Sequence, residues 1–275
     1  MKPGEGQSGF ETSKDVFSAE NVSGQIAAAF NSPEKKAVYL AKKAFLEKYP
    51  TETQAIETVF GIIPTLRNSE GLKTMDAKKD GWKKVKQTLK NVTEYNFLLT
   101  DLIHNNIENR EFLEGLWKTL STLARDVNQE KQFDQLRRGI LSQVAAWRVL
   151  EENGSNPKLS HPGEDAFDSI DLWTEKGEAV QVKGAPIHGV ALIETDTVAF
   201  PGVTFEGKGG GNHYHLNSHL FLEAQRFKAK MSRYGELHNE DTKGLFLVVP
   251  YEDIDFTTGE PNRRVVDEVK KSLPV

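Results

Sequence analysis

The stretch that most constrains this chain is residues 168–184, where apolar and mostly polar residues alternate in two short segments around a turn. Ile170 and Leu172 alternate with such neighbours before the turn, and Val180 and Val182 do so after it. Alternation with a period of two is typical of a strand that has one buried face. Because the two segments are only a few residues apart, the sequence predicts a β-hairpin here.

The turn of this hairpin decides which residues face each other. A loop of three residues would end in Gly177, and such loops need a left-handed residue at that place. It would set Leu172 opposite Val180. It would also set Ile170 opposite Val182, which keeps one face of the hairpin apolar. A loop of two residues would bring a carboxylate into that face, so we expect the three-residue loop.

The other face of the hairpin would then carry Asp171, Gln181 and Lys183 close together. A carboxylate and an amide oxygen suit Mg²⁺, which prefers oxygen ligands and keeps several waters. Lys183 would orient or deprotonate an attacking water, or hold a phosphate oxygen, as metal-assisted phosphodiester cleavage requires. The alternative is a surface hairpin with an incidental charged triplet, and the spacing alone does not separate the two.

These residues resemble the core of a known enzyme superfamily. Residues 170–172 (Ile-Asp-Leu), a short turn and residues 181–183 (Gln-Val-Lys) are similar to the PD-(D/E)XK nucleases. The similarity is to their Mrr-like restriction-endonuclease branch, in which Gln replaces the acidic residue two places before Lys. The resemblance covers about residues 135–190.

The helix expected upstream extends this resemblance. Such nucleases usually have Gly, three residues and Glu, followed by a helix that ends in Gly. Here residues 139–143 have the same spacing, and Gly154 follows after residues 144–153. Gln143 stands where the family usually has Glu, so one acidic group of the expected site is missing.

The resemblance implies hydrolysis of phosphodiester bonds in nucleic acid, dependent on Mg²⁺ or Mn²⁺, with DNA favoured over RNA. Asp171 and Gln181 would hold the metal, Lys183 would activate or orient water, and Gln143 would assist from the helix. Two glutamines at expected acidic positions leave a rival open, a degraded nuclease-like scaffold that binds protein or nucleic acid. A secreted toxin or effector of nuclease type is a further alternative.

The chain divides into two regions of different periodicity. Residues 1–130 predict a helical region that would suit a protein partner, with 1–32 as a flexible leader. Residues 131–275 predict a restriction-endonuclease-like mixed-sheet domain with flanking helices, so the overall class is α+β or α/β. Pro64 would end the second expected helix or mark its last turn. The helices expected up to the hairpin are at 33–50, 51–65, 73–103, 109–127 and 133–153.

The third expected helix carries a cluster of lysines around Trp82. One interpretation is a phosphate-facing helix with an aromatic ring for stacking. The other is a solvated lysine face with Trp82 in the core, which the pattern favours. The lysines are Lys73, Lys78, Lys79, Lys83, Lys84, Lys86 and Lys90.

Acidic residues precede the hairpin in the stretch 156–168, whose prolines and glycine predict a loop. Glu164 and Asp165 are secondary site candidates, because either would replace the missing helix carboxylate as a metal ligand. The alternative for both is a solvated loop charge.

Beyond the hairpin the sequence predicts a second set of strands and helices. The continuous apolar run 244–250 is typical of a strand buried on both faces, and helix 217–234 would connect it to the hairpin sheet. The other expected elements are strands at 189–193 and 197–200, a Gly-rich loop at 206–212 and a closing helix at 263–273.

Two groups in this part would contact substrate phosphate. His213, His215 and His219 have a spacing compatible with zinc, but no acidic partner accompanies them, so phosphate contact or plain surface placement is favoured over zinc. Helix 217–234 is the concentrated basic element of the second region, and a solvated helix face is its alternative role. Its basic residues are Arg226, Lys228, Lys230 and Arg233.

Composition limits these interpretations. The net charge is −5, and residues 131–275 hold 17 basic and 22 acidic residues, so phosphate binding there would be local. No apolar run is long enough for a membrane span, and residues 1–9 lack the apolar core of a secretory signal. The absence of cysteine excludes disulfides and fits a reducing compartment, so we expect a cytoplasmic protein without membrane contact.

Overall fold

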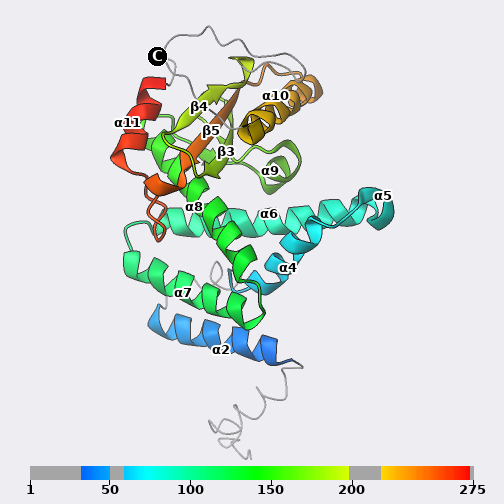
Figure 1. Cartoon of the computed structure of the whole chain (residues 1–275), viewed down its shortest axis with the longest axis vertical. Coiled ribbons are helices and arrows are strands. Elements are labelled where there is room, and N and C mark those ends of the chain that lie inside the picture. Colours follow the sequence, from blue (N-terminus) through cyan, green and yellow to red (C-terminus); the bar gives the residue numbers. More distant parts are fainter. Residues whose placement is uncertain (1–31, 50–58, 198–217, 273–275) are drawn as a thin grey trace, which may run out of the picture.

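The computed structural model describes residues 32–49, 59–197 and 218–272 (Figure 1). Its class is mixed α and β, with helices at one end and a mixed sheet of five strands at the other. Several predicted features lie outside the described residues. These are most of the leader at 1–32, the start of the helix at 51–65, most of the strand at 197–200, the Gly-rich loop at 206–212, His213 and His215.

The first region is helical throughout its described part, as predicted. Ser32 caps the first helix by accepting a hydrogen bond from the Lys35 backbone N–H at 3.2 Å, and proline follows at the first helical position. Asn109 caps the last of these helices in the same way. The helices are α2 (Pro33–Lys48), α4 (Ile62–Leu72), α5 (Ala77–Asp80), α6 (Trp82–Asn105) and α7 (Arg110–Asp126).

Three predictions for this region are wrong. The single helix expected at 73–103 is interrupted at Gly81, which separates α5 from α6. Pro64 does not end a helix but lies in the first turn of α4, where its missing N–H costs no hydrogen bond. Trp82 is not in the core: 67% of its surface is exposed, because it begins α6 at an end that extends past the neighbouring helices. The lysine face therefore includes an exposed aromatic ring.

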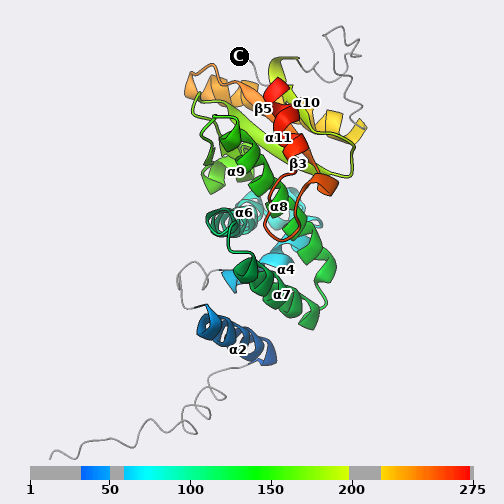
Figure 2. The same cartoon turned by 90° about the vertical axis from the view of Figure 1, so that its left-hand side faces the viewer.

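The second region begins with α8 (Glu130–Glu152), which passes from beside α7 to the sheet (Figure 2). The sheet order is β1-β2-β3-β5-β4, in which β3 and β5 are parallel and all other neighbours are antiparallel. The strands are β1 (Lys158–Leu159), β2 (Leu172–Trp173), β3 (Ala179–Ala185), β4 (Ala191–Glu194) and β5 (Gly244–Pro250). The remaining helices are α9 (Pro162–Asp168), α10 (Ser218–His238), α11 (Arg263–Ser272) and the short 3-10 helices η1 (Thr195–Thr197) and η2 (Tyr251–Asp253).

The prediction for strand 244–250 is confirmed. Every residue of β5 is buried, and the strand lies parallel to β3 after a crossover that contains α10. One face of the sheet packs on α8 within a core that continues into the helical region, from Phe45 to Val269. The other face packs on α10 in a separate cluster that includes Phe227 and Phe246. The helical region and the sheet therefore share a hydrophobic core.

The hairpin is partly as predicted. Leu172 pairs with Val180, and Gly177 has φ +77°, so the three-residue loop is confirmed. The pairing of Ile170 with Val182 is wrong, because β2 is only two residues long and Ile170 packs in the α10-side cluster. The regular alternation of side chains ends at Asp171. Its backbone N–H still pairs with the Val180 carbonyl, but its side chain accepts a hydrogen bond from the Val182 backbone N–H.

The stretch 156–168 is not a loop but contains β1 and α9. His161 and Glu164 form a reciprocal cap at the start of α9, and Pro162 occupies the first turn. Ser169 ends the helix in the left-handed conformation, with φ +60°. Helix α9 therefore determines the directions in which Glu164 and Asp165 project.

Candidate active site

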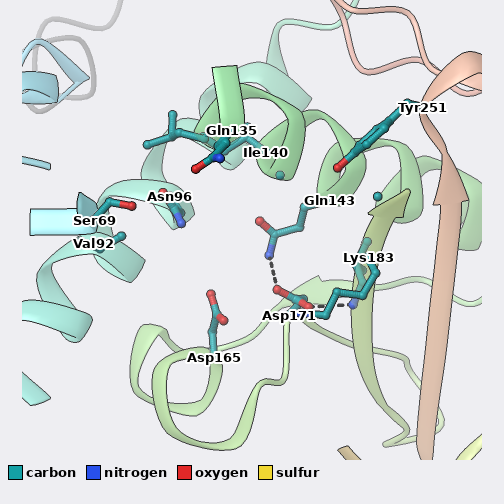
Figure 3. A pocket seen from close by; sticks show the side chains of 14 residues that line it. Ser69, Val92, Asn96, Gln135, Ile140, Gln143, Asp165, Asp171, Lys183 and Tyr251 are labelled. Atoms are coloured by element: carbon teal, nitrogen blue, oxygen red, sulfur yellow. Dashed lines mark hydrogen bonds between the residues drawn. The ribbon is translucent and has the colours of Figure 1, made fainter. Parts of the chain in front are cut away.

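A cavity of about 380 Å³ lies between the helical region and the α8 side of β3 (Figure 3). Helices α4 and α6 form one wall, α9 contributes a second, and α8, β3 and η2 close the third. Asp165, Asp171, Lys183 and Gln143 all line it, so the structure brings together three of the predicted catalytic residues and one secondary candidate. The other lining residues are Ser69, Val92, Asn96, Gln135, Leu136, Gly139, Ile140, Val182, Gly184 and Tyr251.

Asp171 is fixed at the base of this cavity. Its Oδ2 accepts a hydrogen bond from the Val182 backbone N–H at 2.7 Å, and its own N–H donates to the Val180 carbonyl at 2.8 Å. Burial raises the pKa of Asp171 to about 6, although the Val182 N–H and the charge of Lys183 favour its ionised form. The second oxygen, Oδ1, faces Gln143.

Asp165 is the second carboxylate of the cavity, and it projects from α9 towards the same space (Figure 3). Burial raises its pKa to about 8, and the nearby charge of Asp171 contributes to the rise, while Lys183 and Lys230 oppose the shift. Two carboxyl groups with raised pKa values in one cavity form a site that favours a cation.

Lys183 of β3 is among the lining residues, although its register with Val248 puts it on the α10 face of the sheet, like Gln181. Its Nζ lies 3.6 Å from Glu223 Oε2 on α10, and Glu223 is also paired with Arg226 at 2.6 Å. About a third of the Lys183 side chain remains exposed. The charge of Lys183 opposes the rise in pKa of both Asp165 and Asp171, so the ammonium is within electrostatic reach of both carboxylates.

Gln143 acts on Asp171 from α8. Its Oε1 accepts a hydrogen bond from the Thr100 hydroxyl at 2.9 Å, and its Nε2 donates to Asp171 Oδ1 at 3.4 Å. Since the amide oxygen is taken by Thr100, the amide nitrogen is the group that faces the carboxylate. Gln143 therefore orients Asp171 and does not present an oxygen to a metal.

Gln181 is not part of the cavity lining, contrary to the prediction that it converges with Asp171. It is 5% exposed, and its register with Phe246 places it on the α10 face of the sheet. Asp171 reaches the α8 side because the strand breaks at that residue, a tertiary feature that simple alternation does not predict. Asp165, and not Gln181, lines the cavity together with Asp171.

The predicted phosphate contacts on α10 have different environments. Lys230 is half-buried and donates a hydrogen bond to the Ser169 hydroxyl at the end of α9. Arg226 is 70% exposed beside Glu223, and Arg233 is exposed. These three residues do not line the cavity, and His219 is exposed at the start of α10.

Of the two acidic candidates on α9, only Asp165 enters the cavity. Glu164 has a structural role: it caps His161 and accepts hydrogen bonds from Trp173 Nε1 and the Tyr234 hydroxyl, each at 3.2 Å. Sequence reasoning missed Asn96 of α6, which lies opposite Asp165 (Figure 3). Its buried Oδ1 has no hydrogen-bond partner among the described residues, and only the packing of α6 on α9 reveals this position.

Within the described ranges no group of three or more His, Cys, Asp or Glu residues is arranged to hold a metal. None of the helices in the described part of the chain is both long and apolar enough to cross a membrane. No protein-family model, curated protein or solved structure matches this chain.

Proposed function

We propose that this protein is a divalent-metal-dependent nuclease that hydrolyses phosphodiester bonds, with DNA favoured over RNA. The observation that carries the proposal is the meeting of Asp165, Asp171 and Lys183 in one cavity. Two carboxylates and an ammonium are the groups that metal-assisted phosphodiester cleavage uses. The raised pKa values of the two carboxyl groups support a functional pair.

The residues present fit Mg²⁺ or Mn²⁺. Mg²⁺ is typically bound through one or two carboxylates and keeps several waters, so Asp165 and Asp171 suffice as protein ligands. The unpartnered carbonyl oxygen of Asn96 offers a further hydrogen-bond acceptor for a bound water. Zinc is disfavoured, since the cavity lining contains neither His nor Cys. When bound, a divalent ion supplies Lewis-acid polarisation of the phosphodiester.

The side chains of the chain itself would do the rest. Lys183 would hold a phosphate oxygen or orient the attacking water, because its ammonium is partly exposed and near both carboxylates. Gln143 would keep Asp171 in place through its amide N–H. Glu223 pairs with the Lys183 ammonium on the α10 side, so to contact a phosphate in the cavity the ammonium would have to leave this pair.

The order of elements also supports the proposal. Helix α8 is followed by β1, α9 and the hairpin strands β2 and β3, then by the antiparallel edge strand β4, by α10 and by β5, which is parallel to β3. That order agrees with the restriction-endonuclease-like arrangement that the sequence resemblance implies. The fold alone hosts many functions, so the site carries the argument.

A second candidate is a nucleic-acid-binding module without catalysis. The position of Gln181 under α10 favours it, because that placement removes from the cavity one of the two side chains, Asp171 and Gln181, that were expected to hold the metal. The two candidates differ in one measurable respect, which is whether Mn²⁺ or Mg²⁺ produces cleavage.

The test is incubation with labelled single- and double-stranded DNA and RNA in Mn²⁺ or Mg²⁺. We expect cleavage by the wild type, and at least about 100-fold slower cleavage by Asp165→Asn, Asp171→Asn and Lys183→Ala. The matched control is Asp168→Asn, which makes the same charge change on α9 outside the cavity lining. Absence of cleavage by the folded wild type on all four substrates would reject the nuclease and leave the binding module.

A further inference from the structure

The projecting end of α6 combines positive charge with an exposed aromatic ring. Residues 73–90 contain seven lysines and two aspartates, a local charge of +5 in a chain of net charge −5. Within the described residues Lys78, Lys79 and Lys83 have no ion-pair partner, while Lys84 and Lys90 have only exposed pairs with Asp80 and Glu94, at 3.7 and 3.5 Å. Exposed pairs contribute little, so the surface remains basic.

Trp82 and Phe167 add two aromatic rings to this surface. Trp82 is 67% exposed at the start of α6, and Phe167 of α9 is 41% exposed. The Lys86 ammonium lies 5.5 Å from the centre of the Phe167 ring. A large exposed tryptophan is costly to keep in water, and one among lysines suits a ligand that has both flat rings and negative charge.

The same helix leads from this surface to the candidate active site. Val92 lies ten positions after Trp82, which is about 15 Å along a helix axis. Helix α9 lies against α6 and carries both Phe167 and the cavity residue Asp165. In Figure 1, α5 and the first turns of α6 extend beyond the rest of the molecule, so the surface is open to a long ligand.

We propose that the surface formed by Trp82, Lys83, Lys86 and Phe167 binds single-stranded nucleic acid and guides it to the cavity. Bases would stack on the exposed rings while the lysines contact phosphates, an arrangement that tolerates any base sequence. The path of about 15 Å corresponds to about four nucleotides at the stacked spacing of roughly 3.4 Å. This inference rests on the proposed nuclease function and deepens it by naming the substrate as a single strand.

Charge, ring chemistry and the path to the cavity together favour a nucleic acid over other polyanions. An acidic protein would use the lysines without needing the rings. An anionic membrane would use both the lysines and the exposed tryptophan, so it is the path from this surface to the cavity that favours a nucleic acid. A duplex keeps its bases stacked on each other, so its rings are not free to stack on Trp82.

The test measures binding without cleavage. Fluorescence anisotropy of a labelled 20-nucleotide oligothymidylate is recorded at low salt in EDTA with the full chain. We expect Trp82→Ala to weaken binding roughly tenfold, because the ring on which a base stacks is removed. We expect Lys83→Glu with Lys86→Glu to weaken it by at least about tenfold. The slope of log affinity against log salt should also become shallower by about 0.7 for each phosphate that the double variant no longer neutralises.

The matched controls lie on α2, at the far end of the helical region. Lys35→Glu with Lys36→Glu makes the same charge change at exposed positions, and Leu40→Ala removes an apolar side chain that is 50% exposed. Both should bind like the wild type. Equal weakening by these controls, unchanged binding by the α6 variants, or equal affinity for anionic vesicles or poly-glutamate would overturn the inference.

The outcome is separable from that of the nuclease test. Asp171→Asn should bind the oligonucleotide in EDTA at least as tightly as the wild type even where it does not cleave, because it removes a negative charge from the path of the phosphates. If no substrate is cleaved but the α6 variants bind more weakly, the nuclease proposal fails and the binding surface stands. If cleavage occurs and the α6 variants bind with wild-type affinity, the nuclease proposal stands and the binding surface on α6 is rejected.

Discussion

Gln143 donates its amide Nε2 to Asp171 Oδ1 at 3.4 Å, while its Oε1 accepts from Thr100 at 2.9 Å. The nuclease motif predicted from the sequence would place Glu at this helix position. Here it carries a neutral donor aimed at a carboxylate whose pKa is already raised by burial to about 6. The amide therefore stabilises Asp171 without adding charge to a cavity that contains a second carboxylate.

Replacing this amide with a carboxylate should make the folded protein more dependent on metal. In Gln143→Glu a like charge would face Asp171, so we expect the metal-free protein to lose about 1–2 kcal/mol at neutral pH. Added Mn²⁺ should raise the Tm of this variant by more than that of the wild type, because three carboxylates bind a cation more tightly. Gln143→Met, which removes the hydrogen bonds without charge, is the control. Equal Mn²⁺-induced Tm shifts in the wild type and Gln143→Glu would contradict the placement of Gln143 at a cation site.

The pKa of Asp165 predicts how stability depends on pH without metal. Its folded-state pKa is raised to about 8, against about 4 in an unfolded chain, so the folded protein binds more protons between these values. Stability should therefore fall as pH rises through this window, with the full loss reached above about pH 8. Asp165→Asn removes that loss, and we expect it to be more stable than the wild type at about pH 8.5 by on the order of 2 kcal/mol, with the gap closing towards about pH 4.

The measurement is urea unfolding in EDTA at several pH values. Asp134→Asn, an exposed carboxylate on α8, should follow the wild-type pH profile. A constant difference between Asp165→Asn and the wild type across the range would show that Asp165 titrates normally in the folded state.

Gly184 is required where β3 passes close to α8 and η2. A Cβ at this position would lie 2.1 Å from Ser142 Oγ and 2.4 Å from Tyr251 Cε1. We expect Gly184→Ala to destabilise the protein by about 1–3 kcal/mol, since two packed elements would have to separate. Gly139→Ala on α8, whose Cβ would meet nothing within 4 Å, should instead stabilise by up to about 1 kcal/mol. Thermal unfolding of the two variants tests both expectations. An unchanged Tm in Gly184→Ala would show that α8 and β3 are not closely packed at this position.

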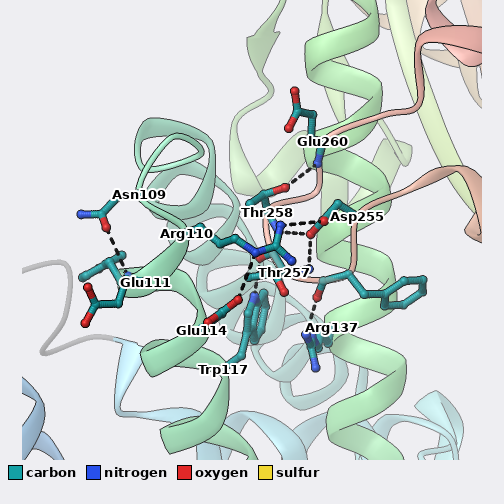
Figure 4. Close-up of polar contacts among 12 residues, drawn as sticks. Asn109, Arg110, Glu111, Glu114, Trp117, Arg137, Asp255, Thr257, Thr258 and Glu260 are labelled. Carbon is teal, nitrogen blue, oxygen red and sulfur yellow. Dashed lines mark hydrogen bonds and ion pairs between the residues drawn. The ribbon is translucent and has the colours of Figure 1, made fainter.

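The loop after β5 is attached to the helical region by polar contacts (Figure 4). Trp117 of α7 donates its Nε1–H to the Thr257 carbonyl at 2.8 Å, and Arg110 pairs with Asp255 at 2.9 Å. Trp117→Phe keeps most of the buried ring but leaves that carbonyl unpaired, so we expect the free energy of unfolding to fall by about 1–2 kcal/mol. Arg110→Ala should cost less, because the ion pair is exposed. Urea unfolding that ranks the two variants in the opposite order would disprove this assignment.

Local sequence signals predicted elements whose cause is local. The cap at Ser32, the left-handed turn at Gly177 and the fully apolar strand at 244–250 all appear where the pattern places them. Each depends on the conformational preference or hydrophobicity of a few neighbouring residues. The short helix α9 was missed, although the His161–Glu164 cap is a local signal that was available.

The candidate site was predicted only in part. Asp171, Lys183 and Gln143 were identified from motif spacing, and the structure places all three around one cavity. Gln181 was placed there by simple alternation, which assumes that both strands of the hairpin are regular. Since β2 begins only at Leu172, Asp171 is free to turn to the α8 side while Gln181 stays beneath α10.

The sequence by itself determined the chain's elements: the helical first region, the hairpin with its turn, and the buried strand that follows a crossover helix. Only the tertiary structure decided that Asp165 joins Asp171, that Asn96 faces them and that Trp82 is exposed. The physical reason is that turns, caps and apolar runs are set by neighbours in sequence. A cavity between α6, α9 and β3 is set by how distant elements pack, and no local pattern encodes that packing.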